Sequence, residues 1–412
     1  MAQSILVIGG GFSGITAALE AAELGEEVYL VEKSPYLGGR VMQLNKYFPK
    51  LCPPSCGLEI QYQRIKNNKN LQVFTLAEVA SVSGEAGNFE VTVKLHPRHT
   101  PASSVDLSGL AESLSQNADN EFEFGLVKRK PLYMSAPFAY PPRYVLDKEN
   151  MTEEDRSKLS KSDQIDLEQQ EKTITLQVGS IIVATGWRPY DTSNLTNLGA
   201  GRIANCISNM QMERLAAPSG PTEGQIKRPS DDTAPKRVAF VQCAGSRDEN
   251  HLNYCSYICC MASLKQARYI REQYPDSEVD IYYIDLRTPG RYENFAKQTL
   301  ADENIQAIKG KVADVEEDLA SGGVWLTAED AISGRKLKNC YDMVVLATGM
   351  QPNLAQETLP LNLSIDEEGF VSDSDRSGII PAGCAVEPLD VMKSAQSGTA
   401  AAMKAIQTVR GR

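Results

Sequence analysis

The sequence predicts an α/β protein with two dinucleotide-binding domains, each built on a Rossmann-type parallel sheet. A short apolar strand near the N-terminus ends in a glycine-rich turn over 9–14, and an alanine-rich helix follows. Two later hydrophobic strands each end in an Ala-Thr-Gly turn, at 184–186 and 347–349. Another buried-strand pattern, at 238–242, begins a second domain. Strands that alternate with helices in this way are typical of parallel sheets covered by helices.

The N-terminal segment carries a complete dinucleotide-binding pattern. Gly9, Gly11 and Gly14 follow the first strand at the spacing Gly-x-Gly-x-x-Gly, and the next strand ends at Glu32. In this pattern the first glycine permits a tight turn, the second lets the backbone approach a pyrophosphate, and the third lets helix and strand pack closely. The helix N-terminus offers N–H groups and partial positive charge to the phosphates. Glu32 stands where a carboxylate accepts a hydrogen bond from the ribose, and its charge disfavours a 2′-phosphate.

A second glycine pair indicates which dinucleotide binds. Gly38-Gly39-Arg40 follows the second strand at a spacing that resembles the FAD-binding flavoprotein superfamily that includes glutathione reductase. The stretch from Ser377 to Cys384 resembles the strand that meets the ribityl chain there, with Cys384 in place of an aspartate. The resemblance implies a glutathione-reductase-like fold with FAD as cofactor. The residues expected to bind FAD are Gly9, Gly11, Phe12, Ser13, Gly14, Glu32, Lys33, Gly38, Gly39, Arg40, Val79, Ala184, Thr185, Gly186, Gly383 and Cys384.

The second domain carries cysteines where the first carries glycines. The turn after the strand at 238–242 contains no Gly-x-Gly-x-x-Gly, so we do not expect a nicotinamide cofactor to rest on it in the usual way. Four thiolates are the usual ligands of a [4Fe–4S] cluster, and thiolates also suit zinc. A cluster is the expected occupant, a zinc site the first alternative, and inert core thiols the second. The candidate ligands, spaced C-x11-C-x3-C-C, are Cys243, Cys255, Cys259 and Cys260.

The segment around these cysteines resembles one particular family. Cys243-Ala-Gly-Ser-Arg-Asp, the later Cys259-Cys260-Met and the stretch Tyr283-Ile-Asp-Leu-Arg-Thr look like the signature of the A subunits of heterodisulfide reductases. In that family the four cysteines hold a [4Fe–4S] cluster next to FAD. The ferredoxin-type cysteine motifs of the family do not occur in this sequence. Without them the chain looks most like the A subunit of the quinone-interacting membrane-bound oxidoreductase complex of sulfate reducers. The short heterodisulfide-reductase-like A subunit of sulfur oxidisers is the next most similar.

The resemblance implies electron transfer as the function. No acid–base constellation accompanies the predicted flavin, so we expect an oxidoreductase subunit without a catalytic side chain. It would pass electrons between the quinone pool and adenylylsulfate reductase during dissimilatory sulfate reduction. The implied partners are a membrane subunit that interacts with quinone and the flavin- and iron–sulfur-bearing B subunit of the same complex. Through them the chain would lie in the cytoplasm, on the inner face of the membrane.

The composition excludes several other classes of function. A net charge of −11 argues against nucleic acid or an anionic membrane as the main partner. The sequence has no apolar run of about 18 residues and no basic segment before its first apolar run, so we expect neither a membrane span nor a secretory signal. Nine cysteines, an odd number, argue against a disulfide scaffold.

Cys52 and Cys56 leave further interpretations open. They are separated by Pro-Pro-Ser shortly after the second glycine pair. The two could be a dithiol that faces the flavin, ligands of a cluster, or a structural pair. A dithiol would suit a stand-alone flavin disulfide reductase, although such an enzyme needs an NAD(P) site that the sequence lacks. A flavin-bearing scaffold protein without redox turnover is a third class.

A Pro-, Ser- and Gly-rich stretch at 218–235 indicates the linker into the second domain. Residues 97–120 are polar and suggest a surface loop. The aromatic, proline-rich stretch at 122–145 is either a docking surface or a loop packed on its own domain. The expected domains are the first part of the FAD-binding domain over 1–215 with an insert at 97–171, the cysteine-bearing domain over 216–345, and the return segment of the FAD-binding domain over 346–412.

Overall fold

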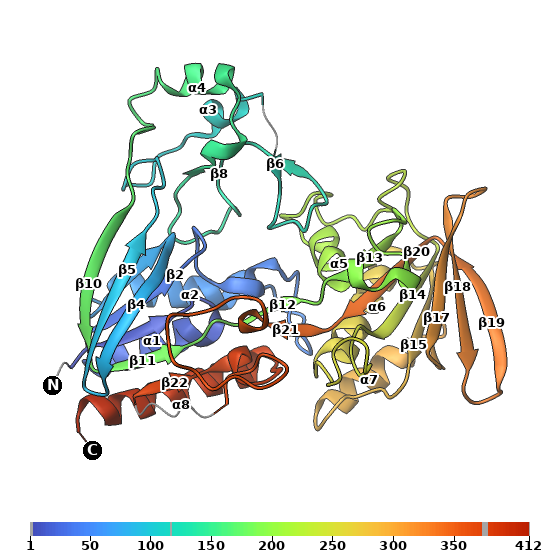
Figure 1. Cartoon of the computed structure of the whole chain (residues 1–412). Coiled ribbons are helices and arrows are strands. Elements are labelled where there is room, and N and C mark those ends of the chain that lie inside the picture. Colours follow the sequence, from blue (N-terminus) through green and yellow to red (C-terminus); the bar gives the residue numbers. More distant parts are fainter. Residues whose placement is uncertain (1–2, 116–117, 373–377, 412) are drawn as a thin grey trace. The chain divides into compact units, whose positions relative to one another are not determined.

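The computed structural model describes residues 3–115, 118–372 and 378–411. The chain forms two compact units (Figure 1). Unit 1 comprises the residues up to 42, then 55–187, and those from 352 onward, whereas unit 2 comprises 43–54 and 188–351. Most of unit 2 is therefore inserted in the sequence of unit 1. The chain enters and leaves this long insertion along two strands that pair with each other, β12 (Trp187–Pro189) and β21 (Met350–Pro352).

A five-stranded parallel sheet forms the centre of unit 1. Its pairings join segments that are far apart in the sequence, because the last strand comes from the return segment. The three inner strands are mostly apolar and almost entirely buried, as expected for a parallel sheet covered on both faces, whereas the two edge strands are partly exposed. In spatial order they are β22 (Ile379–Pro381), β11 (Ser180–Val183), β1 (Ile5–Ile8), β2 (Val28–Glu32) and β3 (Leu71–Thr75).

Two layers cover this sheet. Helices α1 (Phe12–Glu23) and α8 (Val391–Val409) pack against each other and against the strands (Figure 1). Alternate residues of the parallel strands, such as Leu6 and Ile8, pack in one core with an antiparallel sheet. That sheet has the order β10 (Lys172–Val178), β5 (Asn88–Leu95) and β4 (Ala77–Glu85). Helix α2 (Pro54–Asn67) precedes β3.

The insert expected at 97–171 has a small core of its own in unit 1. Leu107, Leu132 and Leu159 are among the buried residues of this core. Asp155 and the N-cap residue Thr152 form a capping box at the start of its second helix. The elements of the insert are α3 (Ser108–Glu112), α4 (Glu153–Leu159) and the paired short strands β6 (Ala118–Asp119) with β7 (Lys128–Arg129) and β8 (Leu132–Tyr133) with β9 (Val145–Leu146).

Unit 2 also has a parallel sheet, in the order β13 (Cys206–Ser208), β20 (Met343–Thr348), β14 (Arg237–Ala244), β15 (Glu278–Tyr283) and β16 (Ile305–Lys309). Helices α5 (Asn209–Ala216), α6 (Cys259–Gln273) and α7 (Tyr292–Leu300) contact its strands. An antiparallel meander of β17 (Val312–Asp318), β18 (Gly323–Asp330) and β19 (Arg335–Tyr341) shares a core with the sheet. Val241 and Leu346 of the sheet and Leu326 of the meander belong to that core.

The units divide the chain at other points than the domain boundaries expected at 215/216 and 345/346. The long part of unit 2 begins at Arg188, and residues 43–54 also belong to it. The chain crosses early because β13 pairs with β20 inside the sheet of unit 2. The stretch at 218–235, which suggested a linker between domains, therefore joins elements within unit 2.

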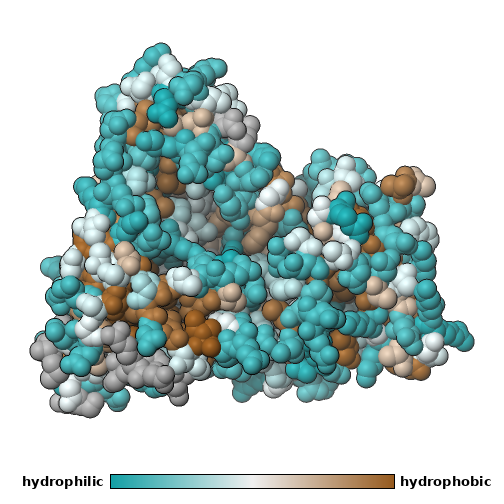
Figure 2. All heavy atoms as spheres, viewed as in Figure 1, coloured by the Kyte–Doolittle hydropathy of each residue, from teal (hydrophilic) through white to brown (hydrophobic). Residues whose placement is uncertain are grey.

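The surface shown in Figure 2 is mostly hydrophilic. The most exposed large apolar side chains are Leu319 and Ile332, at the two turns of the meander. Such single apolar side chains are common on protein surfaces. Among the described residues, no helix combines the length and the apolar character that spanning a bilayer requires.

Candidate functional site

The turn between β1 and α1 is shaped by close backbone contacts at two glycines. Gly9 has a φ of +105°, and a Cβ on it would lie 2.2 Å from the carbonyl oxygen of Ala184. A Cβ on Gly14 would lie 1.9 Å from the carbonyl oxygen of Gly9. Gly11 differs, because a Cβ there would meet nothing within 4 Å. The protein itself therefore excludes side chains at 9 and 14, while the backbone at 11 borders open space that a ligand can approach.

The second glycine pair lies directly against this turn. Gly38 N donates a hydrogen bond to Gly10 O at 2.7 Å, and Gly38 forms an isolated parallel bridge with Gly11. A Cβ on Gly39 would lie 2.9 Å from the Cα of Gly11. Arg40 follows, with its Nε donating to the carbonyl oxygen of Trp187 at 3.2 Å. The structure thus joins two glycine motifs that are separated in the sequence.

Two hydroxyl groups at this turn fit the requirements of a bound phosphate group. Ser13 Oγ, in the first turn of α1, and Thr185 Oγ1, after β11, are buried and have no hydrogen-bond partner among the described residues. Gly383 brings the return segment to the same place, since a Cβ on it would lie 2.7 Å from the Cβ of Ser13. Hydroxyls left unpaired in this way are costly unless a ligand or water pairs with them. Together with the open backbone at Gly11, they fit a dinucleotide.

Glu32 lies at the end of β2, as the motif requires. Its two carboxylate oxygens accept hydrogen bonds from Gly10 N at 2.6 Å and Ser34 N at 2.7 Å, so the backbone fixes its orientation. Each oxygen of an ionised carboxylate has a second lone pair, which leaves room for a ribose hydroxyl. Lys33 has a partner within the protein instead, because its amino group forms an exposed ion pair with Glu357 at 2.5 Å.

Two further residues that the sequence placed at the FAD site have buried side chains. Val79 is part of the core beneath the parallel sheet, so only its backbone is available to a cofactor. The Cys384 thiol donates to the carbonyl oxygen of Leu389 at 3.6 Å and lies 3.7 Å from Ser394 Oγ. Burial raises the pKa of this thiol. Cys384 is therefore held within its own segment as a neutral group, and Ser377, the first residue of that motif, lies outside the described residues.

The aromatic stretch of the insert packs on its own unit, over the loop that carries the second glycine pair. The rings of Phe122 and Tyr36 meet edge to face at 5.7 Å, and the Arg40 guanidinium lies 5.8 Å from the centre of the Phe124 ring. Tyr140 stacks on Tyr62 and accepts a backbone hydrogen bond from Leu37 N at 2.8 Å. Of the two interpretations of this stretch, packing on its own domain is confirmed for these residues.

Sequence reasoning missed Arg98, because its surroundings are polar. The surface loop expected over 97–120 is wrong at this point, since Arg98, His99 and Thr100 are buried. The Arg98 guanidinium donates to Pro35 O at 2.7 Å and to Thr75 Oγ1 at 2.8 Å. Burial, with the nearby Arg143, lowers its pKa to about 10, so it stays charged at neutral pH. It fastens the insert to the loop that follows Glu32, and no sequence pattern indicates this.

In unit 2, the four candidate cysteine ligands lie between the end of β14 and the start of α6. Cys243 is near the carboxyl end of β14, Cys255 is in the connecting loop, and Cys259 and Cys260 are the first residues of the helix. Cys243 and Tyr257 have positive φ values, of 56° and 65°. Backbone strain of this kind, about 1–2 kcal/mol per residue, is concentrated at functional sites.

The surroundings of the four thiols explain how the loop is held. The Cys259 thiol donates to Thr348 O at 3.5 Å, and the Cys260 thiol donates to Asp285 O at 3.6 Å. Burial raises the pKa of Cys259 well above its usual value, and the nearby Cys260, Cys243 and Cys255 add to that effect. Burial also raises the pKa of Cys260 to about 11. The four thiols are therefore close enough to influence one another electrostatically, and in this form Cys259 and Cys260 carry their protons.

The second Ala-Thr-Gly turn supports the cysteine loop. A Cβ on Gly349 would lie 2.3 Å from Ser246 Oγ and 2.9 Å from Ser256 Oγ. Those two hydroxyls are 2.9 Å apart and buried, and Ser256 Oγ also accepts from Met350 N. In the part of the chain that the structure describes, no three His, Cys, Asp or Glu side chains converge closely enough to hold a metal ion. The four-thiol donor set nevertheless matches the chemistry of an iron–sulfur cluster.

Cys52 and Cys56 are free, exposed thiols. The Cys52 thiol lies 3.8 Å from the carbonyl oxygen of Lys50. Cys52 belongs to unit 2 and Cys56 to unit 1. A dithiol, a ligand pair and a structural pair all remain predictions for these residues.

Comparison with known proteins shows which proteins this chain resembles. A model of the FAD dependent oxidoreductase family matches residues 4–48. The second iron–sulfur A subunit of the CoB–CoM heterodisulfide reductase of Methanopyrus kandleri is 38% identical over 97% of this chain and 63% of its own length. The A subunit of the H2:CoB–CoM heterodisulfide, ferredoxin reductase of Methanothermobacter marburgensis is 37% identical over 98% of this chain and 64% of its own length. The chain is a homologue of the heterodisulfide reductase A subunits.

This heterodisulfide reductase homologue spans just under two thirds of the length of those two relatives. Solved thioredoxin reductases share its fold at low identity. That of T. acidophilum has a TM-score of 0.53 at 13% identity and 98% coverage of both chains, and that of Lactococcus lactis has 0.52 at 13% over the full length of both. The predicted resemblance, the two-domain flavoprotein fold, FAD dependence and oxidoreductase class are confirmed.

Proposed function

We propose that this heterodisulfide reductase homologue is an electron-transfer protein that carries FAD in unit 1 and a [4Fe–4S] cluster in unit 2. The observation that supports it best is the four-thiol group between β14 and α6, where a nicotinamide-binding glycine loop would otherwise stand. The name of the Methanopyrus kandleri relative describes an iron–sulfur protein. FAD exchanges one or two electrons, so it suits a partner centre that carries single electrons.

The residues of unit 1 would bind and orient the flavin cofactor. Gly11 leaves room for the pyrophosphate, and Ser13 Oγ and Thr185 Oγ1 offer it hydrogen bonds. The N-terminus of α1 adds its partial positive charge. Glu32 would accept a ribose hydroxyl while its two backbone hydrogen bonds keep it oriented. These contacts position the cofactor and do not depend on a proton-transferring side chain.

In unit 2 the four cysteines would be the cluster ligands. Ligation requires thiolates, so binding releases the protons that burial keeps on Cys259 and Cys260. These two residues begin α6, where the helix dipole stabilises negative charge on sulfur. The positive φ of Cys243 coincides with the register shift near the carboxyl end of β14.

The place of the chain in a respiratory complex is also a proposal. The names of its relatives describe subunits of heterodisulfide reductases, which supports association with partner proteins. On the sequence resemblance, we assign the chain to a complex that passes electrons between the quinone pool and adenylylsulfate reductase. A quinone-interacting membrane protein, together with the flavin- and iron–sulfur-bearing B subunit, would hold it at the cytoplasmic face of the membrane.

The cofactor content of the protein tests the cluster directly. We expect protein purified without oxygen to contain one FAD with about four iron and four sulfide. Cys255→Ser should lose the iron and the cluster's electron paramagnetic resonance signal while keeping FAD. Cys340→Ser is the matched control, because Cys340 is a partly exposed cysteine of unit 2 outside the four-thiol group, and it should keep both. Full iron content in Cys255→Ser would sink the four-cysteine assignment.

A test of the protein's position in the electron-transfer pathway requires the assembled complex. We expect reduced menaquinone analogue to reduce adenylylsulfate reductase only when the wild-type chain is present with its partners. If Cys255→Ser leaves this electron flux unchanged, the chain is a flavin-bearing scaffold. If the chain assembles instead with sulfur-oxidising partners, the assignment to sulfate reduction is wrong.

A stand-alone disulfide reductase is the second candidate, because both Cys52 and Cys56 are exposed and free. Such an enzyme would reduce its flavin with NADH or NADPH. We expect neither nucleotide to bleach the flavin spectrum at a useful rate, because the turn after β14 lacks the glycine motif. Rapid bleaching by either nucleotide, coupled to reduction of a disulfide substrate that Cys52→Ser abolishes while bleaching persists, would favour the reductase.

A further inference from the structure

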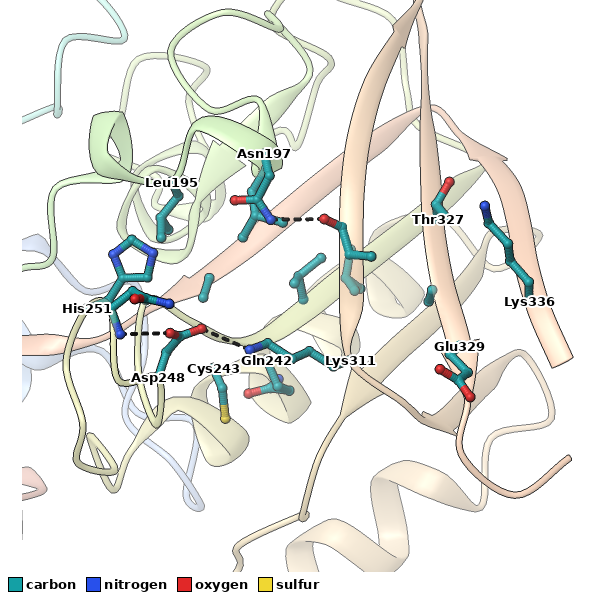
Figure 3. Close-up of a pocket in the computed structure, with 18 of the residues that line it drawn as sticks. Leu195, Asn197, Gln242, Cys243, Asp248, His251, Lys311, Thr327, Glu329 and Lys336 are labelled. Atoms are coloured by element: carbon teal, nitrogen blue, oxygen red, sulfur yellow. Dashed lines mark hydrogen bonds and ion pairs between the residues drawn. The ribbon is translucent and has the colours of Figure 1, made fainter. Parts of the chain in front are cut away.

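Arg98 is held differently from other cations of this protein. Lys311 of unit 2 shows the more usual arrangement. It lines a pocket of about 680 Å³ at the carboxyl end of β14, together with Gln242, and its amino group pairs with Asp248 at 2.8 Å (Figure 3). Arg98 of unit 1 is 5% exposed, its guanidinium donates to neutral oxygens, and no carboxylate of the described residues forms an ion pair with it. Removing a guanidinium from water is costly, so a buried cation of this kind indicates a specific role.

The contacts of Arg98 fix the loop that follows Glu32. Arg98 Nη2 donates to Pro35 O at 2.7 Å and to Thr75 Oγ1 at 2.8 Å, so it joins this loop to the end of β3. The preceding residue, Ser34, donates from its N–H to Glu32 Oε1 at 2.7 Å. Arg98 therefore holds the backbone next to the residue that orients the Glu32 carboxylate.

A second contact of the insert holds the other end of the same loop. Leu37 N donates to Tyr140 O at 2.8 Å, while Tyr62 donates its hydroxyl to Leu37 O at 2.9 Å and stacks on the Tyr140 ring. The Leu37 side chain is buried against the glycine turn, since a Cβ on Gly10 would lie 2.5 Å from its Cδ2. The insert thus contacts the main chain at both ends of the loop between Glu32 and the second glycine pair.

A loop that is fixed in advance should bind a cofactor more tightly than a loose one. Ordering a loop costs conformational entropy, and a cofactor that had to order it on binding would lose affinity. The insert removes this cost when the protein folds. A guanidinium suits the task, because a charged donor makes stronger hydrogen bonds than a neutral one. By linkage, the bound cofactor should in turn stabilise the docked insert.

We propose that the insert at 97–171 is a brace for the FAD site and that Arg98 is the positioning residue through which it acts on Glu32. This inference rests on the proposed FAD site of unit 1. It gives the insert a role in retaining the adenosine half of the cofactor, because Glu32 is the residue proposed to accept the ribose hydroxyl. The contribution of the brace is to cofactor affinity and leaves the chemistry of the flavin to other groups.

The release of FAD from the purified full-length holoprotein tests the proposal. We expect Arg98→Met to release FAD about tenfold faster or more, as measured by the fluorescence of free flavin after dilution. Thr75→Val removes one acceptor of Arg98 and keeps the side-chain shape, so it should release FAD about two- to threefold faster. Arg156→Met is the matched control, because Arg156 is exposed on α4 of the same insert and pairs with Glu153 of that helix, and it should behave as the wild type does.

Two further measurements distinguish positioning from a general loss of stability. ADP carries the ribose and the pyrophosphate without the flavin, so Arg98→Met should weaken competition by ADP for the apoprotein by a factor similar to that for FAD. A double-mutant cycle with Glu32→Ala provides the second measurement. Because Arg98 acts through Glu32, Arg98→Met should weaken FAD binding by no more than about twofold when that carboxylate is absent.

Thermal unfolding shows whether Arg98→Met folds. If it does not, Thr75→Val decides, together with hydrogen exchange of the wild-type insert, where FAD should slow exchange around Leu107 and Leu132 of its core. Equal FAD release by the wild type and both variants, an undiminished effect of Arg98→Met in the Glu32→Ala protein, or insert exchange that does not respond to FAD would overturn the proposal. A wild-type protein that binds no FAD would overturn the FAD site and the brace together.

Discussion

The turn after β1 and the turn after β14 occupy the same place in two similar sheets, but they differ in what they can bind. Each strand pairs with a neighbour that ends in Ala-Thr-Gly, β11 in unit 1 and β20 in unit 2. In unit 1 the Ala184 carbonyl excludes any side chain at Gly9. In unit 2 the Thr348 carbonyl accepts a hydrogen bond from the Cys259 thiol. One backbone frame therefore supports either a glycine cradle or a group of thiols.

The helices that follow the two turns are also fixed differently. Helix α1 packs closely on α8, where a Cβ on Gly398 would lie 2.4 Å from the carbonyl oxygen of Ser13. Helix α6 is fixed by a buried ion pair between Lys265 and Glu213, 2.9 Å apart and almost fully enclosed. The comparison indicates that close packing of small residues places the first helix, whereas a buried charge network places the second.

The largest effect is expected from breaking that network. Lys265→Met should lower the free energy of unfolding by about 3–5 kcal/mol, because it leaves the Glu213 carboxylate buried without its cation. Lys265 also donates to the carbonyl oxygen of Lys46 at 2.6 Å, so the segment 43–54 should loosen. Urea denaturation measures the loss. Lys297→Met, which breaks the exposed pair with Glu293, is the control and should change stability by about 0–1 kcal/mol.

Two substitutions in the glycine turn should distinguish an effect on folding from an effect on FAD binding. Gly14→Ala should destabilise the protein by about 2–4 kcal/mol and abolish FAD binding, because its Cβ would overlap the carbonyl oxygen of Gly9. Gly11→Ala should change the stability of the apoprotein by about 1 kcal/mol or less, since its Cβ meets open space, yet it should also lose FAD. Flavin content and thermal unfolding of the apoproteins measure the two effects. A Gly11→Ala protein that binds FAD normally would contradict the proposed approach of the pyrophosphate.

The smallest effect concerns the insert, which adjoins the glycine turn in unit 1. Burial acts to raise the pKa of Asp155, but hydrogen bonds from Ser115 and Thr152 outweigh it and lower that pKa to about 2. A carboxyl with a lowered pKa stabilises the folded state above its unfolded pKa, near 3.9, and loses that contribution as pH falls toward 2. We therefore expect up to about 2 kcal/mol of local stability to disappear between pH 5 and pH 2.

Hydrogen exchange in the insert, followed against pH, measures this loss. The Asp155→Asn variant should be less stable than the wild type at pH 6 and should show little change on acidification. A wild-type insert whose exchange rates do not respond to pH, after correction for intrinsic exchange, would contradict the role of the carboxylate.

Much of unit 1 was predictable from the sequence, because its decisive features are local. The strands at 5–8 and 28–32, the helix between them and Glu32 follow one another within a single motif. Arg98 could not be found in this way. Its partners Pro35 and Thr75 are brought to it only by tertiary folding, and a polar neighbourhood in the sequence suggests exposure.

In unit 2 the cysteine group was visible through its spacing, but the pocket was not. Gln242 is an ordinary residue of an apolar strand until a register shift removes it from both ladders. The stretch at 218–235 suggested a linker between domains, and the structure differs for a related reason. Proline and serine mark an irregular segment, but they do not say whether it lies within a unit or between two.

The return of the chain to unit 1 has a consequence for biosynthesis. Strand β22 completes the parallel sheet beside β11, and α8 covers α1, although nearly the whole sequence separates those two helices. During translation the first glycine motif leaves the ribosome long before Gly383 and Gly398, which close the cradle around Ser13. Unit 2 can fold earlier, because its elements are nearly contiguous in the sequence. The nascent chain is therefore expected to have unit 2 formed while the flavin cradle is still open, so that FAD is captured only after the return segment has been synthesised.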